Sequence, residues 1–488
     1  MKIGQTAVVG FLAKFLGSIL GFVGTIYFAQ KLGANVLGTY SLIIALTGWL
    51  SIAGNLGIGN ATIKRVSEGT EQGSYLSASI ILLGILTSII LFSLFIGHHY
   101  VEEYISDFGS YSTISVVWFI AILVVVDLLN GLVRVVLSGL HLVHVSAILK
   151  PVQIGFKTII QVLLVIIGYS LVGILVGNIL ATILVAILGV TFISIRPSMP
   201  DRSHFIDLID YAKYSWLGSI KSRAYNDADI VILGVFVTQS LIGVYSVTWT
   251  IVKFVDMFGS AVSSAIFPEI SKISAEESET AIVALIEDAL AYTGIVAIPG
   301  LVGGSLLADR LFEIYGSEFN QGTEVLPLLL VSMTFYTYLQ QFLNGLNGID
   351  MPNVSFKINM VFLSSNVLLN LALVWYIGWV GAAIASALST LIGLCIAYFV
   401  FDSIVEITVP TREIGKQIIA SLCMGAIVWT AEWLADKYEY IQYEFVTTVG
   451  LVAVGATSYV LILIFISDRF RQVVQRNLPI QMILKQFR

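Results

Sequence analysis

Eleven ionisable side chains lie within the long apolar stretches of this 488-residue chain, and they are the first candidates for chemistry. An ionisable group at the middle of a membrane span costs at least about 2.5 kcal/mol, so it is retained for pairing or for function. The basic ones are Lys14, Arg134, Lys157, Lys221, Arg223, Lys253 and Lys357, and the acidic ones are Asp127, Asp227, Asp229 and Asp256. The positive excess suits an anionic substrate such as a phosphate or a diphosphate.

Part of this charge can be neutralised within single helices. Lys253 and Asp256 are spaced i,i+3, and Lys221 and Arg223 lie within about two turns of two aspartates. Purely structural pairing therefore stays open as an alternative to substrate binding. Arg134 and Lys357 lie near the ends of their apolar stretches, where a long side chain can extend to the headgroups.

Sequence motifs of enzymes are weak or absent. Asp227-Ala228-Asp229 matches a D-x-D pattern, but it lies in the middle of an apolar stretch with no loop to hold a nucleotide. His141 and His144 are spaced i,i+3, and no Cys, Asp or Glu completes a metal-ligand set. No Walker sequence, nucleophile elbow or H-E-x-x-H motif occurs. We therefore expect a protein that is not an enzyme, with no cofactor and no metal site.

The composition of the chain indicates what kind of structural element carries these charges. Only 11% of the residues are charged, compared with about 25% in an average soluble domain, whereas 57% are hydrophobic and the mean hydropathy is +0.92. This excludes a disordered chain, a nucleic-acid-binding protein and an ordinary soluble enzyme. We predict an all-α polytopic protein of the cell membrane, with fourteen spans at about 6–30, 36–57, 77–97, 113–137, 146–168, 170–194, 212–236, 241–266, 281–308, 323–347, 354–376, 379–401, 414–435 and 446–467.

The basic residues of the loops give the orientation. With the N-terminus inside, fifteen Lys and Arg residues fall in inner segments and three in outer segments, so both termini are predicted to be cytoplasmic. The longest loop has about 20 residues. Any function must therefore reside in the membrane region.

An internal repeat divides the chain. Leu32-Gly33 followed by Gly38-Thr39-Tyr40-Ser41 recurs as Leu233-Gly234 followed by Gly243-Val244-Tyr245-Ser246. Ser138-Gly139-Leu140 likewise recurs as Asn344-Gly345-Leu346, and Gly168-Tyr169 as Gly378-Trp379. We predict two six-helix lobes, 1–200 and 201–405, related by a pseudo-two-fold axis, followed by two additional helices and a basic tail at 406–488.

Several short segments, in a characteristic order along nearly the whole chain, carry a family resemblance. They are Lys31 to Leu42, Gly57 to Asn60 with Arg65 to Glu68, Asp229 to Gly234 with Gly243 to Tyr245, Phe267 to Ser271, Tyr315 to Phe319, and Asn366 to Asn370 followed by Val380 to Ala385. The chain resembles the polysaccharide-transporter family, which includes the O-antigen and lipid-linked oligosaccharide flippases. This family belongs to the superfamily shared with the multidrug and toxic-compound extruders.

The resemblance implies a fold with twelve core helices around a V-shaped cavity. It also implies alternating-access translocation of a glycan, linked to a polyprenyl or dolichyl (di)phosphate, from the inner to the outer leaflet. Partners would be this substrate, membrane lipids and the glycosyltransferases or polymerase of the same pathway, and nucleic acid is not expected.

The resemblance also implies where the substrate binds. Cationic residues of the relatives hold the phosphate, and by helix and depth their counterparts here are Lys14, Lys221, Arg223 and Lys253. Tyr225 and Asn226 are expected to meet the sugars. The carboxylates of Asp127, Asp229 and Asp256 are candidates to bind a coupling proton or Na⁺.

Two other functions remain open. A cation-coupled drug extruder would share the fold, but it is expected to carry an acidic rather than a basic excess in its spans. A protein that only scaffolds a glycan-assembly complex would translocate nothing.

Overall fold

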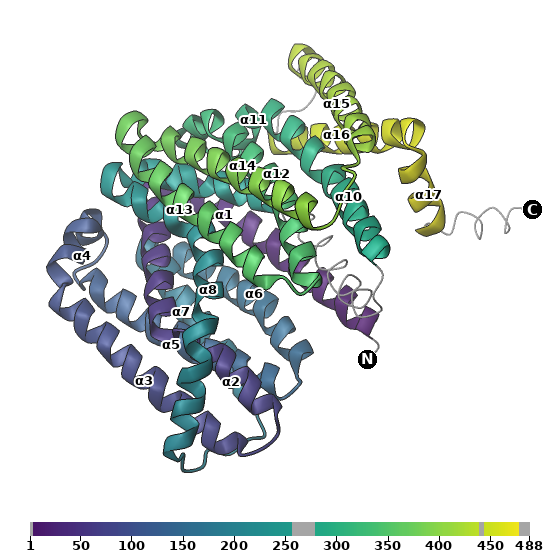
Figure 1. Ribbon diagram of the computed structural model, residues 1–488. Coiled ribbons are helices and arrows are strands. Elements are labelled where there is room, and N and C mark those ends of the chain that lie inside the picture. Colours follow the sequence, from purple (N-terminus) through teal and green to yellow (C-terminus); the bar gives the residue numbers. More distant parts are fainter. Residues whose placement is uncertain (1–2, 256–278, 439–443, 478–488) are drawn as a thin grey trace, which may run out of the picture. The chain divides into compact units, whose positions relative to one another are not determined.

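The computed structural model describes residues 3–255, 279–438 and 444–477, and every regular element in these ranges is helical (Figure 1). This confirms the all-α prediction for the described residues. The helices are α1 (Ile3–Asn55), α2 (Ile58–Ser67), α3 (Gln72–Ile96), α4 (His98–Tyr104), η1 (Ser106–Ser110), α5 (Val116–Gly139), α6 (Val143–Ile167), α7 (Ser170–Val190), α8 (Arg202–Phe236), α10 (Glu279–Leu306), α11 (Ala308–Glu313), η2 (Ser317–Glu324), α12 (Leu326–Gly348), α13 (Pro352–Ile377), α14 (Trp379–Ile404), α15 (Thr411–Tyr438), α16 (Glu444–Ile466) and α17 (Asp468–Asn477).

Ten helices of the described residues are long and apolar enough to cross a membrane. One of them lies within α1, which covers the predicted span 6–30 and nearly all of 36–57. The 53 residues of α1 would extend roughly 80 Å if straight, far more than the hydrocarbon core of a bilayer. Gly33 breaks the helix with φ 79° and ψ 175°, a backbone conformation that only glycine adopts readily. The connection between the two predicted spans is therefore a single glycine bend.

Two other glycines, which the predicted repeat pairs, each follow the end of a helix. Gly168 follows α6 with φ 106°, and Gly378 follows α13 with φ 68°. Left-handed glycines commonly end helices because they turn the chain without a Cβ clash. Each is followed at once by the next helix, α7 or α14.

The chain forms two compact units. The first comprises Met1–Val247 and Asn370–Ala382, and the second comprises Thr248–Leu369 and Ala383–Arg488. In the first unit, α1 packs against α5, α6, α7 and α8, while α2 packs against α5 and α8. In the second unit, α10 packs against α12 and α15, and α15 packs against α16. The predicted lobe boundaries at residues 200 and 405 stay a prediction.

Two helices of the first unit come into close contact at two glycines that the predicted repeat pairs. A Cβ atom on Gly38 of α1 would overlap the main-chain carbonyl of Gln239, and a Cβ on Gly243 would overlap the carbonyl of Ala34. The predicted repeat pairs Gly38 with Gly243. Gly38 approaches Gln239, which is four residues before Gly243, and Gly243 approaches Ala34, which is four residues before Gly38. The backbones of α1 and the helical residues 239–255 therefore touch at this crossing.

Candidate functional site

Charged side chains from three helices of the first unit gather in the region predicted to lie in the membrane. Arg223 of α8 forms an ion pair with Asp227 one turn further on, with 2.8 Å between Nη1 and Oδ2. Asp127 of α5 lies within electrostatic reach of Arg223, of Arg134 on its own helix, and of Lys157 on α6. All five side chains are partly buried. We call these five residues the cationic cluster, because three of them are basic and two are acidic.

The packing of α5 on α6 explains why two basic side chains of the cluster are near Asp127. Ser138 bonds Ser146 at 3.4 Å between their Oγ atoms, and the Asn130 amide donates to Gln153 at 3.4 Å. Both contacts fit one antiparallel register of α5 and α6. In this register Asp127 and Lys157 lie at the same level along the two helices.

The same register produces a polar stripe on each helix. On α5 the stripe carries Asp127, Asn130 and Arg134, at the i, i+3, i+7 spacing of one helix face. On α6 it carries Gln153, Lys157 and Gln161 at i, i+4, i+8. Asp127 and Lys157 of the cluster thus lie in a polar seam between α5 and α6.

A second polar group surrounds Asp229 of α8. Its side chain is 2% exposed. Its Oδ2 accepts a hydrogen bond from the Tyr245 hydroxyl at 2.7 Å, and its Oδ1 accepts one from the Asn370 amide at 2.9 Å. A carboxylate, a hydroxyl and an amide provide the oxygen atoms that small hard cations prefer, and a carboxylate also binds a proton. Among the described residues, no group of three or more His, Cys, Asp or Glu could hold a metal ion.

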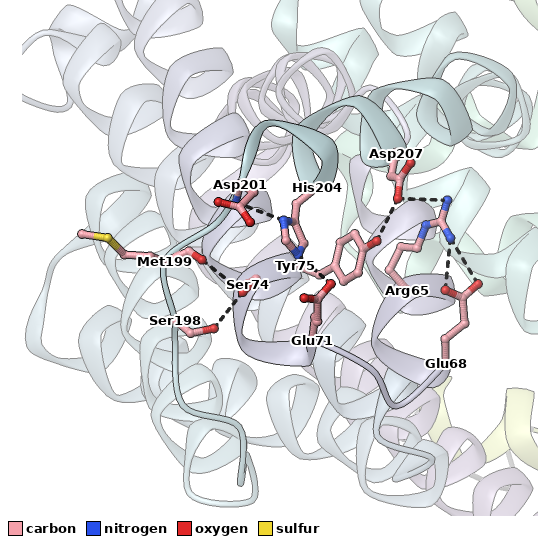
Figure 2. A network of polar contacts seen from close by, with 10 residues as sticks. All are labelled: Arg65, Glu68, Glu71, Ser74, Tyr75, Ser198, Met199, Asp201, His204 and Asp207. Atoms are coloured by element: carbon pink, nitrogen blue, oxygen red, sulfur yellow. Dashed lines mark hydrogen bonds and ion pairs between the residues drawn. The ribbon is translucent and has the colours of Figure 1, made fainter.

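The first turns of α8 are anchored by a network of polar contacts, shown in Figure 2. The Tyr75 hydroxyl donates to Asp207 at 2.8 Å, and Arg65 lies 3.6 Å from the same carboxylate. Arg65 also pairs with Glu68 at 3.1 Å, and this hydrogen bond raises the pKa of Arg65 above its ordinary value. The network holds the first turns of α8 to α2 and α3.

A capping box begins α8 within this network. His204 Nδ1 accepts the backbone N–H of Asp201 at 3.0 Å, and the Asp201 side chain accepts the backbone N–H of His204. His204 Nε2 lies 3.3 Å from a carboxylate oxygen of Glu71. Two orphan donors at the helix start are satisfied in this way, which fixes where α8 begins and hence the level of Arg223.

A cavity in the second unit has a different character. A groove of about 600 Å³ runs between α10 and α15 in the second unit, lined by Leu301, Val302, Ser305, Leu306, Leu422, Gly425, Ala426 and Trp429. No ionisable side chain lines it. The groove is therefore separate from the candidate charged residues.

The structure places the residues predicted from the sequence in different surroundings. Arg223 and Asp127 belong to the cationic cluster, and Asp229 belongs to the oxygen-rich group around Tyr245. Lys253 is in the second unit, where its Nζ lies 5.7 Å from the centre of the Trp249 ring. Tyr225 of α8 is buried. The others are not described by the structure: the side chains of Lys14, Lys221 and Asn226, and the whole of Asp256.

Arg134 and Lys157 are the residues that the site assignment from sequence missed. Arg134, near the end of its apolar stretch, lies within electrostatic reach of Asp127. Lys157 had no assigned role. The signal that could have found both is the matching spacing of polar residues along two consecutive apolar helices.

Comparisons with known proteins identify the family and the fold. Residues 3–274 match the model of a family described as polysaccharide biosynthesis protein. The chain is similar to the "Probable flippase AglR" of Haloferax volcanii, with 29% identity over 98% of each chain. It is also similar to the "Probable low-salt glycan biosynthesis flippase Agl15" of the same organism, with 28% identity over 91% of this chain and 92% of the relative. A solved structure of the lipid II flippase MurJ in an inward closed conformation has the same fold, with a TM-score of 0.78 and 18% identity over 96% of this chain and 100% of that one.

Proposed function

This chain belongs to the polysaccharide biosynthesis protein family, and from that membership we propose that it is a flippase for a lipid-linked glycan. It is a multi-pass protein of the cell membrane. Two relatives that it matches over nearly their whole length are named as flippases, one of them for glycan biosynthesis. The substrate is a sugar chain joined through a phosphate or diphosphate to a polyprenyl or dolichyl lipid.

The observation that carries this proposal is the cationic cluster. Among the described residues, Arg134, Lys157 and Arg223 face two aspartates, so the cluster retains a net positive charge within membrane-spanning helices. A charge of this kind needs an anionic partner when it is desolvated. The phosphate of a lipid-linked glycan is such a partner, and arginine binds phosphate oxygens through its planar fork.

The finer architecture is part of the same proposal. Fourteen spans would form lobes 1–200 and 201–405 with two appended helices at 406–488, and both termini would be cytoplasmic. The bend at Gly33, the paired Gly38 and Gly243, and the equivalent left-handed Gly168 and Gly378 support two repeats. Substrate would be exposed alternately to each side by movement of one lobe against the other.

Coupling to Na⁺ or H⁺ is proposed to use aspartates. Asp229 has the strongest support, because its buried carboxylate is surrounded by the hydroxyl of Tyr245 and the amide of Asn370. Asp127 is the second candidate because it neutralises part of the cationic cluster. Asp256 is kept as a candidate on its sequence position alone. No covalent step is proposed.

The test is translocation by the purified protein in vesicles. The probe is a polyprenyl phosphate that carries a fluorescent hexose, and its transfer is followed by quenching with a reagent that does not cross the bilayer. Arg223→Ala should reduce the initial rate at least about tenfold, because phosphate binding loses its guanidinium. Lys357→Ala is the matched control, since Lys357 is also a basic residue of an apolar helix but is exposed and outside the cluster.

Two results would contradict the proposal. A full translocation rate in Arg223→Ala vesicles would remove the cationic cluster from substrate binding. No translocation by the unaltered protein would favour a scaffold that depends on glycosyltransferases or a polymerase. The drug extruder is tested with a lipophilic cation in the same vesicles, and the basic excess of the cluster predicts that this cation is not transported.

A further inference from the structure

Gly48 of α1 lies directly against the guanidinium group of Arg223. A Cβ atom built on Gly48 would overlap Nη2, Cζ and Nε of that side chain, so no other residue fits at this position with Arg223 where it is. Gly48 belongs to α1 and Arg223 to α8, and the two helices pack against each other in the first unit. The missing side chain thus creates a notch in the surface of α1, into which the guanidinium fits.

Two contacts define the position of the guanidinium group. Nη1 binds Asp227 Oδ2 at 2.8 Å, and the opposite part of the group fills the notch at Gly48. Nε is buried and has no hydrogen-bond acceptor among the described residues. The Arg223 side chain is 31% exposed, so it is held in place and still accessible.

The glycine at position 48 does not stabilise α1 itself. Glycine in the interior of a helix is less favourable than alanine, because its backbone loses more freedom on folding. Gly48 lies in a regular part of α1, since the only non-helical backbone angles of this helix are at Gly33. The guanidinium that lies against position 48 gives a physical reason for a glycine there.

We propose that Gly48 is a positioning residue for substrate binding, which holds the Arg223 guanidinium at the height and orientation at which it meets the phosphate of the substrate. This inference rests on the proposed flippase function. It adds that one uncharged residue on a different helix decides whether the cationic cluster can bind the substrate phosphate. The charge of Arg223 alone is not sufficient, because the same charge displaced from the notch points elsewhere.

The experiment compares Gly48→Ala in two backgrounds, the unaltered protein and Arg223→Lys. The lysine variant keeps the positive charge but has a flexible ammonium group in place of the planar guanidinium. Translocation of the fluorescent polyprenyl phosphate hexose is measured over a range of probe concentrations, so that the apparent KM and the maximal rate are separated. Gly84→Ala on α3 is the matched control, because a Cβ there meets no atom within contact distance.

Gly48→Ala should raise the apparent KM at least about tenfold in the unaltered background. In Arg223→Lys, which already binds the probe more weakly, the same substitution should change the KM less than twofold. The thermal unfolding temperature and the size-exclusion profile of Gly48→Ala should equal those of Gly84→Ala.

An equal change of KM in both backgrounds would overturn the inference, because Gly48 would then act through helix packing rather than through Arg223. A normal KM in Gly48→Ala, together with loss of binding in Arg223→Ala, would overturn the inference and leave the proposed function standing. A normal KM in both variants would overturn the assignment of the cluster as well.

Discussion

Single charges of the cationic cluster should have opposite effects on substrate binding. Lys157 and Asp127 lie on adjacent helices within electrostatic reach of each other. Removing the lysine lowers the net positive charge of the cluster, whereas removing the aspartate raises it. The effective dielectric constant in such a site is well below that of water, so each change is felt strongly.

Lys157→Gln is accordingly predicted to raise the apparent KM for the polyprenyl phosphate probe about tenfold. Asp127→Asn is predicted to lower it several-fold, because the phosphate then competes with one carboxylate fewer. Binding of the probe to the purified protein, measured by fluorescence titration at several salt concentrations, checks both signs. Changes of the same sign in the two variants would show that the cluster does not act through its charge.

At the scale of the helices, small residues set how closely the elements approach. The reciprocal contact of Gly38 and Gly243 lets the backbones of α1 and residues 239–255 touch. Close approach of this kind between helices depends on residues without a side chain, as is common in membrane proteins. The two glycines that the predicted repeat pairs are therefore also in packing contact.

Gly38→Ala is predicted to destabilise the protein by about 1–3 kcal/mol, the usual cost of overpacking a tight contact. The new Cβ would overlap the carbonyl of Gln239, which is main chain and cannot rotate away. Thermal unfolding in detergent measures the loss, and Gly131→Ala on α5 is the control because a Cβ there meets nothing within contact distance. Equal melting temperatures of the two variants would contradict the predicted contact.

At the scale of the whole molecule, transport against a gradient requires an ion whose binding is linked to the conformational change. Asp229 is suited to that role because its carboxylate is almost completely buried and meets neutral hydrogen-bond donors from α13 and from residues 239–255. A bound cation or proton would compensate the charge of this carboxylate. The ion would thereby connect three segments that are distant in the sequence.

Asp229→Asn is predicted to abolish the dependence of translocation on a Na⁺ or H⁺ gradient while slow equilibration of the probe across the bilayer continues. Vesicles with and without each imposed gradient distinguish the two ions. Asp227→Asn is the comparison, since Asp227 is paired with Arg223 and should alter probe binding instead. Persistence of gradient stimulation in Asp229→Asn would exclude Asp229 as the coupling site.

The sequence by itself determined that this is a helical membrane protein, where its apolar stretches lie, and that the basic side chains within them outnumber the acidic ones. These properties follow from the sequence alone, because the hydropathy of a segment is nearly the sum over its own residues and its length sets whether it can span a membrane. The glycines of the repeat were visible for the same reason.

Only the tertiary structure decided which charges meet. The partners of Asp127, the carboxylate that Arg223 binds, and the notch at Gly48 depend on how each helix is rotated and at what level it is packed. Rotation and level result from the fit of many side chains between helices. An aspartate and a lysine 30 residues apart, or an arginine and a glycine 175 residues apart, therefore carry no mark of their contact in the sequence.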